Sequence, residues 1–142
     1  VARIRRSNRH VFYGDLTSMA LLRRLSPHNA LGMVVTVDDA AIAGSLVAAA
    51  RGEWPSLLIV ARARDARHAA VLYRAGATDA VPETIEASLQ LSEAVLVELG
   101  IPMGRIIVSI HEKRAEIQDG IKAEAPSAAV RALGGRRLRD TL

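Results

Sequence analysis

Six small or polar residues of this chain follow short, mostly apolar runs, at the points where strands of an α/β protein would end. The runs are residues 10–13, 31–37 and 57–61, and the last of them is five apolar residues in succession. In open α/β sheets, ligands bind outside the carboxyl ends of the strands. These six are therefore the candidate ligand-binding residues. They are Gly14, Asp15, Thr17, Asp38, Arg62 and Arg64.

The chemistry of this set is that of an anion site or of an ion pair. Arg62 and Arg64 lie two residues apart and so share one side of an extended chain. They can bind one anion together or pair with the aspartates, and we expect the ion pair. The carboxylates of Asp15 and Asp38 and the hydroxyl of Thr17 can instead cap the helices that follow the strands. The glycine before Asp15 permits close approach of the backbone to a ligand.

Residues for catalysis or metal binding are sparse in this pattern. None of the four histidines has metal-ligand spacing to another histidine or to a carboxylate, so we expect no metal site. The chain has no cysteine, and no serine or threonine has a nucleophile-elbow setting. Both lysines, Lys113 and Lys122, lie in the last predicted helix, which excludes the pocket of a phosphate receiver. The strand ends offer only aspartate and arginine, which favours binding over catalysis.

The composition fits one domain in which helices pack closely on a sheet. The chain has 142 residues, of which 50% are hydrophobic but only 3% are aromatic. No apolar run approaches the roughly 20 residues needed to span a bilayer, and no signal peptide is recognisable. The chain begins with Val1, so we expect it to be part of a longer polypeptide.

The net charge of +4 is concentrated near the C-terminus. Residues 125–142 hold four arginines and one aspartate, whereas the rest of the chain is close to neutral. We expect this basic tail to be flexible and solvated. Contact with phosphate or with an anionic membrane surface is the alternative. No aromatic residues interleave the basic ones, which argues against a nucleic-acid partner.

Strand-like and helix-like segments alternate along the chain, which is typical of an α/β fold with a parallel sheet. The run at residues 57–61 predicts a strand buried on both faces. The last predicted helix begins after Pro102, which is a plausible first-turn residue. The predicted strands are residues 10–14, 31–37, 57–61 and 78–81, and the predicted helices are residues 18–25, 39–51, 66–75, 84–99 and 103–123.

The last predicted helix carries a narrow apolar stripe formed by Ile106, Ile107, Ile110 and Ile117. A single small sheet domain offers this stripe no obvious partner, and an exposed apolar patch marks an interface. We therefore expect residues 101–124 to form an interface helix, which makes a homodimer or docks on a neighbouring subunit.

Five segments taken together match a known pattern in order and spacing. They are residues 11–17 (Val-Phe-Tyr-Gly-Asp-Leu-Thr), 34–39, 59–65 (Ile-Val-Ala-Arg-Ala-Arg-Asp), 75–77 and 83–84. As a set they resemble the second half of the regulator-of-potassium-conductance (TrkA-N-like) domain of Kef-type potassium/proton antiporters. The resemblance covers about residues 1–100. It implies a Rossmann-type fold, a cytoplasmic position after a membrane transporter domain, dimerisation, and control of ion flux by NAD(H), AMP or ATP.

The resemblance also implies roles for single residues. The turn of Gly14, Asp15 and Thr17 would lie against the adenine end of a nucleotide, and Arg62 and Arg64 would face the cleft between subunits. The glycine-rich phosphate turn (G-x-G-x-x-G) and the acidic ribose-binding residue of the family are absent from this chain. We therefore expect nucleotide binding by the chain alone to be weak or absent.

A second departure concerns glutathione. Members of the family that are gated by glutathione carry an arginine just before the Glu-Thr pair, and this chain has Pro82 there. The sequence thus argues against gating by glutathione.

The sequence predicts three segments: residues 1–100 as the second half of a Rossmann-type regulatory domain, 101–124 as the interface helix, and 125–142 as the basic tail. The function we expect is that of a regulatory fragment of a potassium or cation/proton antiporter. The fragment would lie on the cytoplasmic side of the membrane, and its partners would be an adenine nucleotide and the transporter domain. The alternatives are a fragment of a soluble NAD-dependent Rossmann enzyme and a pure protein-interaction module.

In a six-strand Rossmann sheet the strands lie side by side in the order 3-2-1-4-5-6, so the third and fourth strands along the chain are not neighbours. If residues 10–14 are the third strand and residues 31–37 the fourth, two absent strands should lie between them. Either another segment fills the gap, or the sheet closes and these two strands pair directly. We expect residues 31–37, 57–61 and 78–81 to pair in this order, and residues 10–14 to lie apart unless another segment fills the gap.

Overall fold

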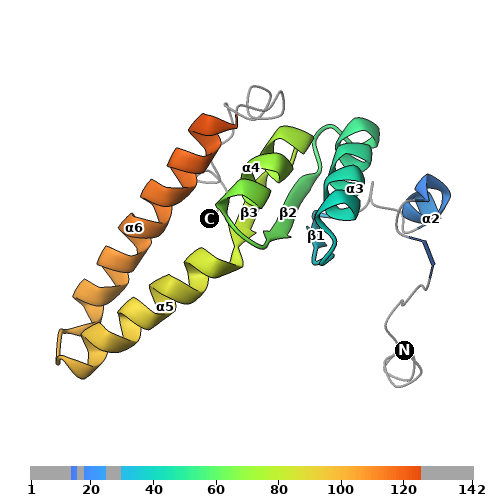
Figure 1. The fold of residues 1–142 in the computed structure, drawn as a ribbon. Helices are drawn as coiled ribbons and strands as arrows, with labels where there is room; N and C mark the ends of the chain where they lie inside the picture. The colour runs from blue at the N-terminus through green and yellow to red at the C-terminus, as the bar shows by residue number, and fades with distance from the viewer. Residues whose placement is uncertain (1–13, 16–17, 25–29, 126–142) are drawn as a thin grey trace, which may run out of the picture.

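The structure is a computed structural model that describes residues 14–15, 18–24 and 30–125 (Figure 1). Three parallel strands form one sheet in the order β1 (Gly32–Val35), β2 (Leu58–Ala63) and β3 (Asp79–Pro82). The predicted pairing of these three strands is confirmed. The predicted strand at residues 10–14 lies outside the described residues except for Gly14.

Helices alternate with the strands, as the sequence predicts. They are α2 (Met19–Arg24), α3 (Ala40–Glu53), α4 (Ala66–Ala75), α5 (Glu83–Glu98) and α6 (Met103–Glu124). In the described part of the chain, no helix is long and apolar enough to cross a membrane. The chain is therefore an α/β protein with a partial Rossmann-type sheet flanked by helices.

The sheet is covered on one face, where α3 and α4 pack (Figure 1). On β2, Ile59, Ala61 and Ala63 are fully buried on this face. On the other face, Leu58 is 46% exposed and Val34 of β1 is 73% exposed. The prediction of a strand buried on both faces is thus wrong for the described residues, because both βαβ crossovers are right-handed and place their helices on the same side.

The hairpin of α5 and α6 extends away from the sheet (Figure 1). Ile106 and Ile110 of α6 are buried against Leu89 of α5. Ile117 packs on the main core, and Ile107 is 48% exposed. The predicted stripe therefore has a partner within the chain, contrary to the sequence-based expectation. The reason is that α5 folds back along α6 and supplies an apolar face that the sheet does not.

The C-terminal end of α6 is anchored to the sheet through Tyr73, a buried residue of α4. The Tyr73 hydroxyl donates to Asp79 Oδ1 at 2.5 Å. Lys122 Nζ of α6 lies 3.8 Å from the same carboxylate oxygen and 5.3 Å from the centre of the Tyr73 ring. Burial and the hydrogen bond to Asp79 raise the pKa of Tyr73, so its hydroxyl remains a donor.

One guanidinium group holds together the amino-terminal edge of the sheet. Arg51, in the last turn of α3, donates to the carbonyl oxygens of Gly76 at 2.8 Å and Pro55 at 2.7 Å. It also donates to Thr78 Oγ1 at 3.1 Å, and this hydroxyl accepts the Ile59 N–H of β2. Gly76 has a φ of 108°, and a Cβ there would lie 2.6 Å from Arg51 Cγ. Arg51 therefore links α3, β2 and the turn before β3.

We expect Arg51→Met to lower the free energy of unfolding by about 2 kcal/mol, because it leaves several part-buried oxygens without their donor. The measurement is urea unfolding followed by circular dichroism. Arg74→Met is the matched control, since Arg74 is an exposed arginine on α4, and it should change the free energy by no more than about 0.5 kcal/mol. Equal effects of the two substitutions would contradict the role of Arg51.

Candidate functional site

The carboxyl ends of the three strands meet at one edge, and two of the aspartates there are helix caps. Asp39 Oδ1 accepts the N–H groups of Ala41 and Ile42 at 2.9 Å each, so it caps α3. Asp65 Oδ1 accepts the His68 N–H at 2.9 Å and caps α4. The hydrogen bond from the His68 backbone is the main reason why the pKa of Asp65 is lowered. These two carboxylates are thus used by the fold.

Arg62 forms the internal ion pair that the sequence predicts. It pairs with Asp38, and its Nη1 lies 3.0 Å from Glu83 Oε1. Its Nη2 also donates to the Thr36 carbonyl oxygen at 2.9 Å. Desolvation alone would lower the pKa of Arg62, but the hydrogen bonds and charges of Asp38 and Glu83 outweigh it and raise the pKa. Arg62 therefore joins the ends of all three strands.

Sequence reasoning missed Glu83, although a signal for it existed. Glu83 follows β3 just as Asp38 follows β1, so the strand-end rule places both carboxylates at the same edge. The side chain of Asp38 is 94% exposed and that of Glu83 is 52% exposed, so both sides of the Arg62 ion pairs are open to solvent.

Arg64 differs from Arg62 in having an open side chain on a fixed backbone. Its Nε lies 3.9 Å from Asp65 Oδ2, and its side chain is 74% exposed. Its backbone N–H donates to Nδ1 of the buried His68 at 3.1 Å, and its carbonyl accepts the Thr84 N–H at 3.2 Å. Each arginine thus has an aspartate beside it, but two carboxylates occupy Arg62 whereas the Arg64 guanidinium is largely in solvent. Joint binding of one anion by the two arginines stays a prediction.

The predicted turn before α2 is described only in part. Gly14 and Asp15 are exposed, the Ser18 N–H donates to the Asp15 carbonyl at 3.1 Å, and Thr17 lies outside the described residues. At the other end of α2, Arg23 forms two hydrogen bonds with Glu53, the last residue of α3.

This ion pair joins the last turn of α2 to the last residue of α3, so the C-terminal ends of the two helices lie next to each other. The position of Gly14 and Asp15 at the strand edge stays a prediction.

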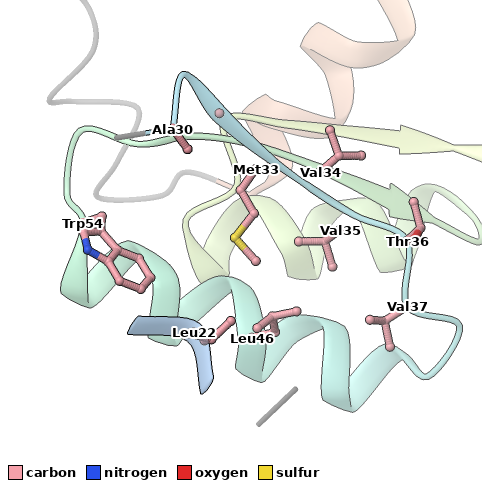
Figure 2. A pocket seen from close by; sticks show the side chains of 10 residues that line it. Leu22, Ala30, Met33, Val34, Val35, Thr36, Val37, Leu46 and Trp54 are labelled. Atoms are coloured by element: carbon pink, nitrogen blue, oxygen red, sulfur yellow. The ribbon is translucent and has the colours of Figure 1, made fainter. Parts of the chain in front are cut away.

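Next to β1 lies an apolar trough of about 350 Å³ (Figure 2). Figure 2 shows Met33 and Val35 pointing toward α3, which supplies Leu46, while Val34 points to the other face. Trp54 closes the trough beyond the end of α3. No local sequence pattern indicates this trough, because its walls come from segments far apart along the chain. Its lining residues are Leu22, Ala30, Gly32, Met33, Val34, Val35, Thr36, Val37, Leu46 and Trp54.

Two further features of the described residues complete this edge. Pro82, the residue just before the Glu-Thr pair, is fully buried at the end of β3. The described residues contain no group of three or more histidine or acidic side chains that could hold a metal ion. The groups open to a ligand at the strand edge are thus the Arg64 side chain and the exposed Arg62 ion pairs.

A family model described as the TrkA-N domain matches residues 1–83 of this chain. A solved structure titled "Shewanella denitrificans Kef CTD in AMP bound form" has a similar fold, with a TM-score of 0.69 and 30% sequence identity. The similarity covers 81% of this chain and 73% of that chain.

Several curated potassium-efflux proteins are also similar. A KefB-type K(+) efflux antiporter of Alkalimonas amylolytica is 36% identical over 104 residues, which are 73% of this chain and 16% of that protein. K(+) efflux antiporter 2 of Arabidopsis thaliana, a chloroplastic protein, is 34% identical over 105 residues, 74% of this chain and 9% of the antiporter. The glutathione-regulated potassium-efflux system protein KefC of Klebsiella pneumoniae is 35% identical over 98 residues, 69% of this chain and 16% of KefC. The chain thus spans less than a fifth of the length of these relatives.

Proposed function

This chain belongs to the TrkA-N domain family, and from that premise we propose that it is a regulatory, ligand-sensing part of a potassium or cation/proton antiporter, which gates ion flux through nucleotide binding and dimerisation. The observation that carries the proposal is the similarity to the Kef C-terminal domain, together with 34–36% identity to potassium-efflux antiporters. In this function the chain works on the cytoplasmic side of the membrane, next to a transporter domain.

In this proposal, residues 1–100 are the second half of a Rossmann-type regulatory domain, residues 101–124 form the interface helix, and residues 125–142 form the basic tail. The parallel sheet of the described residues supports the first assignment, because it has only three strands whereas a complete Rossmann sheet has six. The second assignment is supported by the exposed apolar side chains of α6 that remain beside its buried stripe, such as Ile107. The basic tail lies outside the described residues except for Ala125, which is buried in the main core.

The proposed ligand is an adenine nucleotide. The solved Kef domain is described as bound to AMP, and the phosphate of such a ligand requires a cation at the strand edge. Arg64 supplies that cation, because its guanidinium is exposed while its backbone is fixed by His68 and Thr84. The ion pair of Arg62 with Asp38 holds the ends of the strands together. The turn of Gly14, Asp15 and Thr17 faces the adenine.

Binding rather than catalysis is the role that fits these groups. The exposed groups at the strand edge are Arg64 and the ion pairs of Arg62. An arginine is not a general base near neutral pH, and the carboxylates are held in ion pairs with Arg62. His68 is buried, and its Nδ1 already accepts the Arg64 N–H. A nucleotide would therefore act as an effector on this chain.

We expect this chain to bind AMP, ATP and NADH with dissociation constants weaker than 1 μM (about −8 kcal/mol), because it lacks the glycine-rich turn that holds a pyrophosphate. Arg64→Gln should weaken AMP binding roughly threefold to tenfold, through loss of a charge-assisted hydrogen bond. Isothermal titration calorimetry measures both effects. Arg105→Gln, on α6, is the control and should bind as the parent does. Unchanged affinity in Arg64→Gln would refute the role of Arg64.

Dimerisation through the α5–α6 hairpin follows from its uncovered apolar side chains. Leu91, Val95 and Leu99, at spacings of four residues along and just past α5, are 70%, 58% and 70% exposed. Ile107 of α6 is 48% exposed. A second copy of the chain is the proposed partner, because an isologous contact buries the same stripe on both copies.

A double substitution, Leu91→Lys with Val95→Lys, tests this contact without touching the buried side of the hairpin. We expect the parent chain to sediment as a dimer and the variant as a monomer, because two charges facing their symmetry mates oppose association. Gln90→Lys adds a charge to another exposed side of α5 and should leave the dimer intact. A parent chain that remains monomeric at high concentration would rule out this interface.

Control of ion flux is tested in a whole transporter. In a chimaera, this chain replaces the matching segment of the Klebsiella KefC relative, and potassium flux is measured in membrane vesicles. We expect the flux to change with AMP or NADH and not with glutathione, because Pro82 replaces the arginine of the glutathione-gated pattern. The same transporter with the segment deleted is the control. Flux that ignores adenine nucleotides would overturn the regulatory function.

A further inference from the structure

Both terminal nitrogens of the Arg62 guanidinium have partners within the chain, and Glu83 takes one of them. Arg62 Nη1 donates to Glu83 Oε1 at 3.0 Å. Arg62 Nη2 donates to the Thr36 carbonyl oxygen at 2.9 Å and pairs with Asp38. An anion that reaches this edge must therefore replace a carboxylate before it can bind these nitrogens of Arg62.

The carboxylates of these ion pairs can be exchanged for another anion because they lie in solvent. The side chain of Asp38 is almost fully exposed, and that of Glu83 is about half exposed. Exposed ion pairs contribute little to stability, and a phosphate offers more negative charge and more acceptor oxygens than a carboxylate. The Thr36 carbonyl keeps its hold on Nη2, so the guanidinium stays at the edge when a carboxylate leaves it.

Of the two carboxylates, Glu83 has the backbone that is tied to the arginine-bearing strand. Glu83 is the first residue of α5 and follows β3 directly. The N–H of the next residue, Thr84, donates to the Arg64 carbonyl oxygen at 3.2 Å, which fixes the first turn of α5 against the end of β2. Asp38 instead lies in the connection between β1 and α3. Glu83 is therefore a tethered partner of Arg62, present at a high effective concentration.

The Glu83 side chain also has room to turn away from Arg62. It borders a groove of about 500 Å³ that β3, α5 and α6 form together. Glu86, one turn further along α5, lines the same groove, but Arg114 of α6 binds its carboxylate at 2.8 and 2.9 Å and balances its charge. Glu83 can thus release Arg62 by rotation of its side chain, without movement of the hairpin.

We propose that Glu83 is a tethered competitor for Arg62, which determines which anions the strand edge accepts. While Glu83 holds Arg62, the edge offers one open arginine, Arg64. A phosphate that displaces Glu83 is held by both arginines, whereas a carboxylate ligand gains nothing by replacing another carboxylate. The edge therefore selects phosphate-bearing ligands. This proposal rests on the proposed function, because it places the anion beside Arg64.

The substitution Glu83→Gln tests the competition, because it removes the charge and keeps the shape of the side chain. We expect it to raise the affinity of the chain for AMP and for inorganic phosphate roughly threefold to tenfold. Isothermal titration calorimetry at constant ionic strength measures both, and the two ligands distinguish a nucleotide from free phosphate. The gain should disappear when Glu83→Gln is combined with Arg62→Gln, because it acts through Arg62.

Two further variants separate the contact from the charge. Glu83→Asp keeps the charge but shortens the side chain, so it should also raise the affinity, although by less. Glu98→Gln removes the same charge at the far end of α5 (Figure 1), about 22 Å along the helix, and should bind as the parent does because salt screens that distance. Circular dichroism checks that each variant folds.

Unchanged affinity for both ligands in Glu83→Gln would overturn the competition, and so would an equal gain in the double variant without Arg62. The proposed function is tested separately by Arg64→Gln. Nucleotide binding that does not depend on Arg64 contradicts the proposed function, whereas phosphate affinity that does not respond to Glu83 contradicts only the competition.

Discussion

Two arginines hold the central strand β2 at its two ends, and the arrangement of the other elements depends on them. At the amino-terminal edge, Arg51 binds carbonyl oxygens and the Thr78 hydroxyl, which in turn accepts an N–H of β2. At the carboxyl-terminal edge, Arg62 pairs with Asp38 after β1 and Glu83 after β3. Each guanidinium therefore joins segments that are distant in sequence, which a planar group with five donors can do.

The acceptors of the two arginines differ, and this distinguishes the amino-terminal edge of the sheet from the edge where we propose that a ligand binds. The acceptors of Arg51 are neutral oxygens of the fold, namely two carbonyl groups and the Thr78 hydroxyl, and they occupy its N–H groups. At the other edge, the charge of Arg62 is balanced by exposed carboxylates, and Arg64 is left with only a distant contact to Asp65. In the proposed function, Arg64 is the side chain of this edge that binds the anion.

The sequence by itself determined the elements and their order. The alternation of apolar runs and helical segments was sufficient for three parallel strands, because strand and helix periodicities are local properties. The ends of the strands were also local, so the position of Arg62 and its ion pair could be anticipated. The resemblance to TrkA-N domains rested on the same local segments, since Gly14, Asp15 and the Arg-Ala-Arg-Asp run keep their spacing along the chain.

Only the tertiary structure decided which surfaces are covered. The apolar residues of β2 suggested burial on both faces, but both crossovers place their helices on one side, so Leu58 and Val34 remain exposed. Ile106 and Ile110 looked like an interface until the fold brought α5 against them. The choice of Glu83 as a partner of Arg62 likewise depends on strand order, and so does the apolar trough beside β1. Periodicity fixes which side chains share a face, but the partner of that face is set by contacts between segments far apart in sequence.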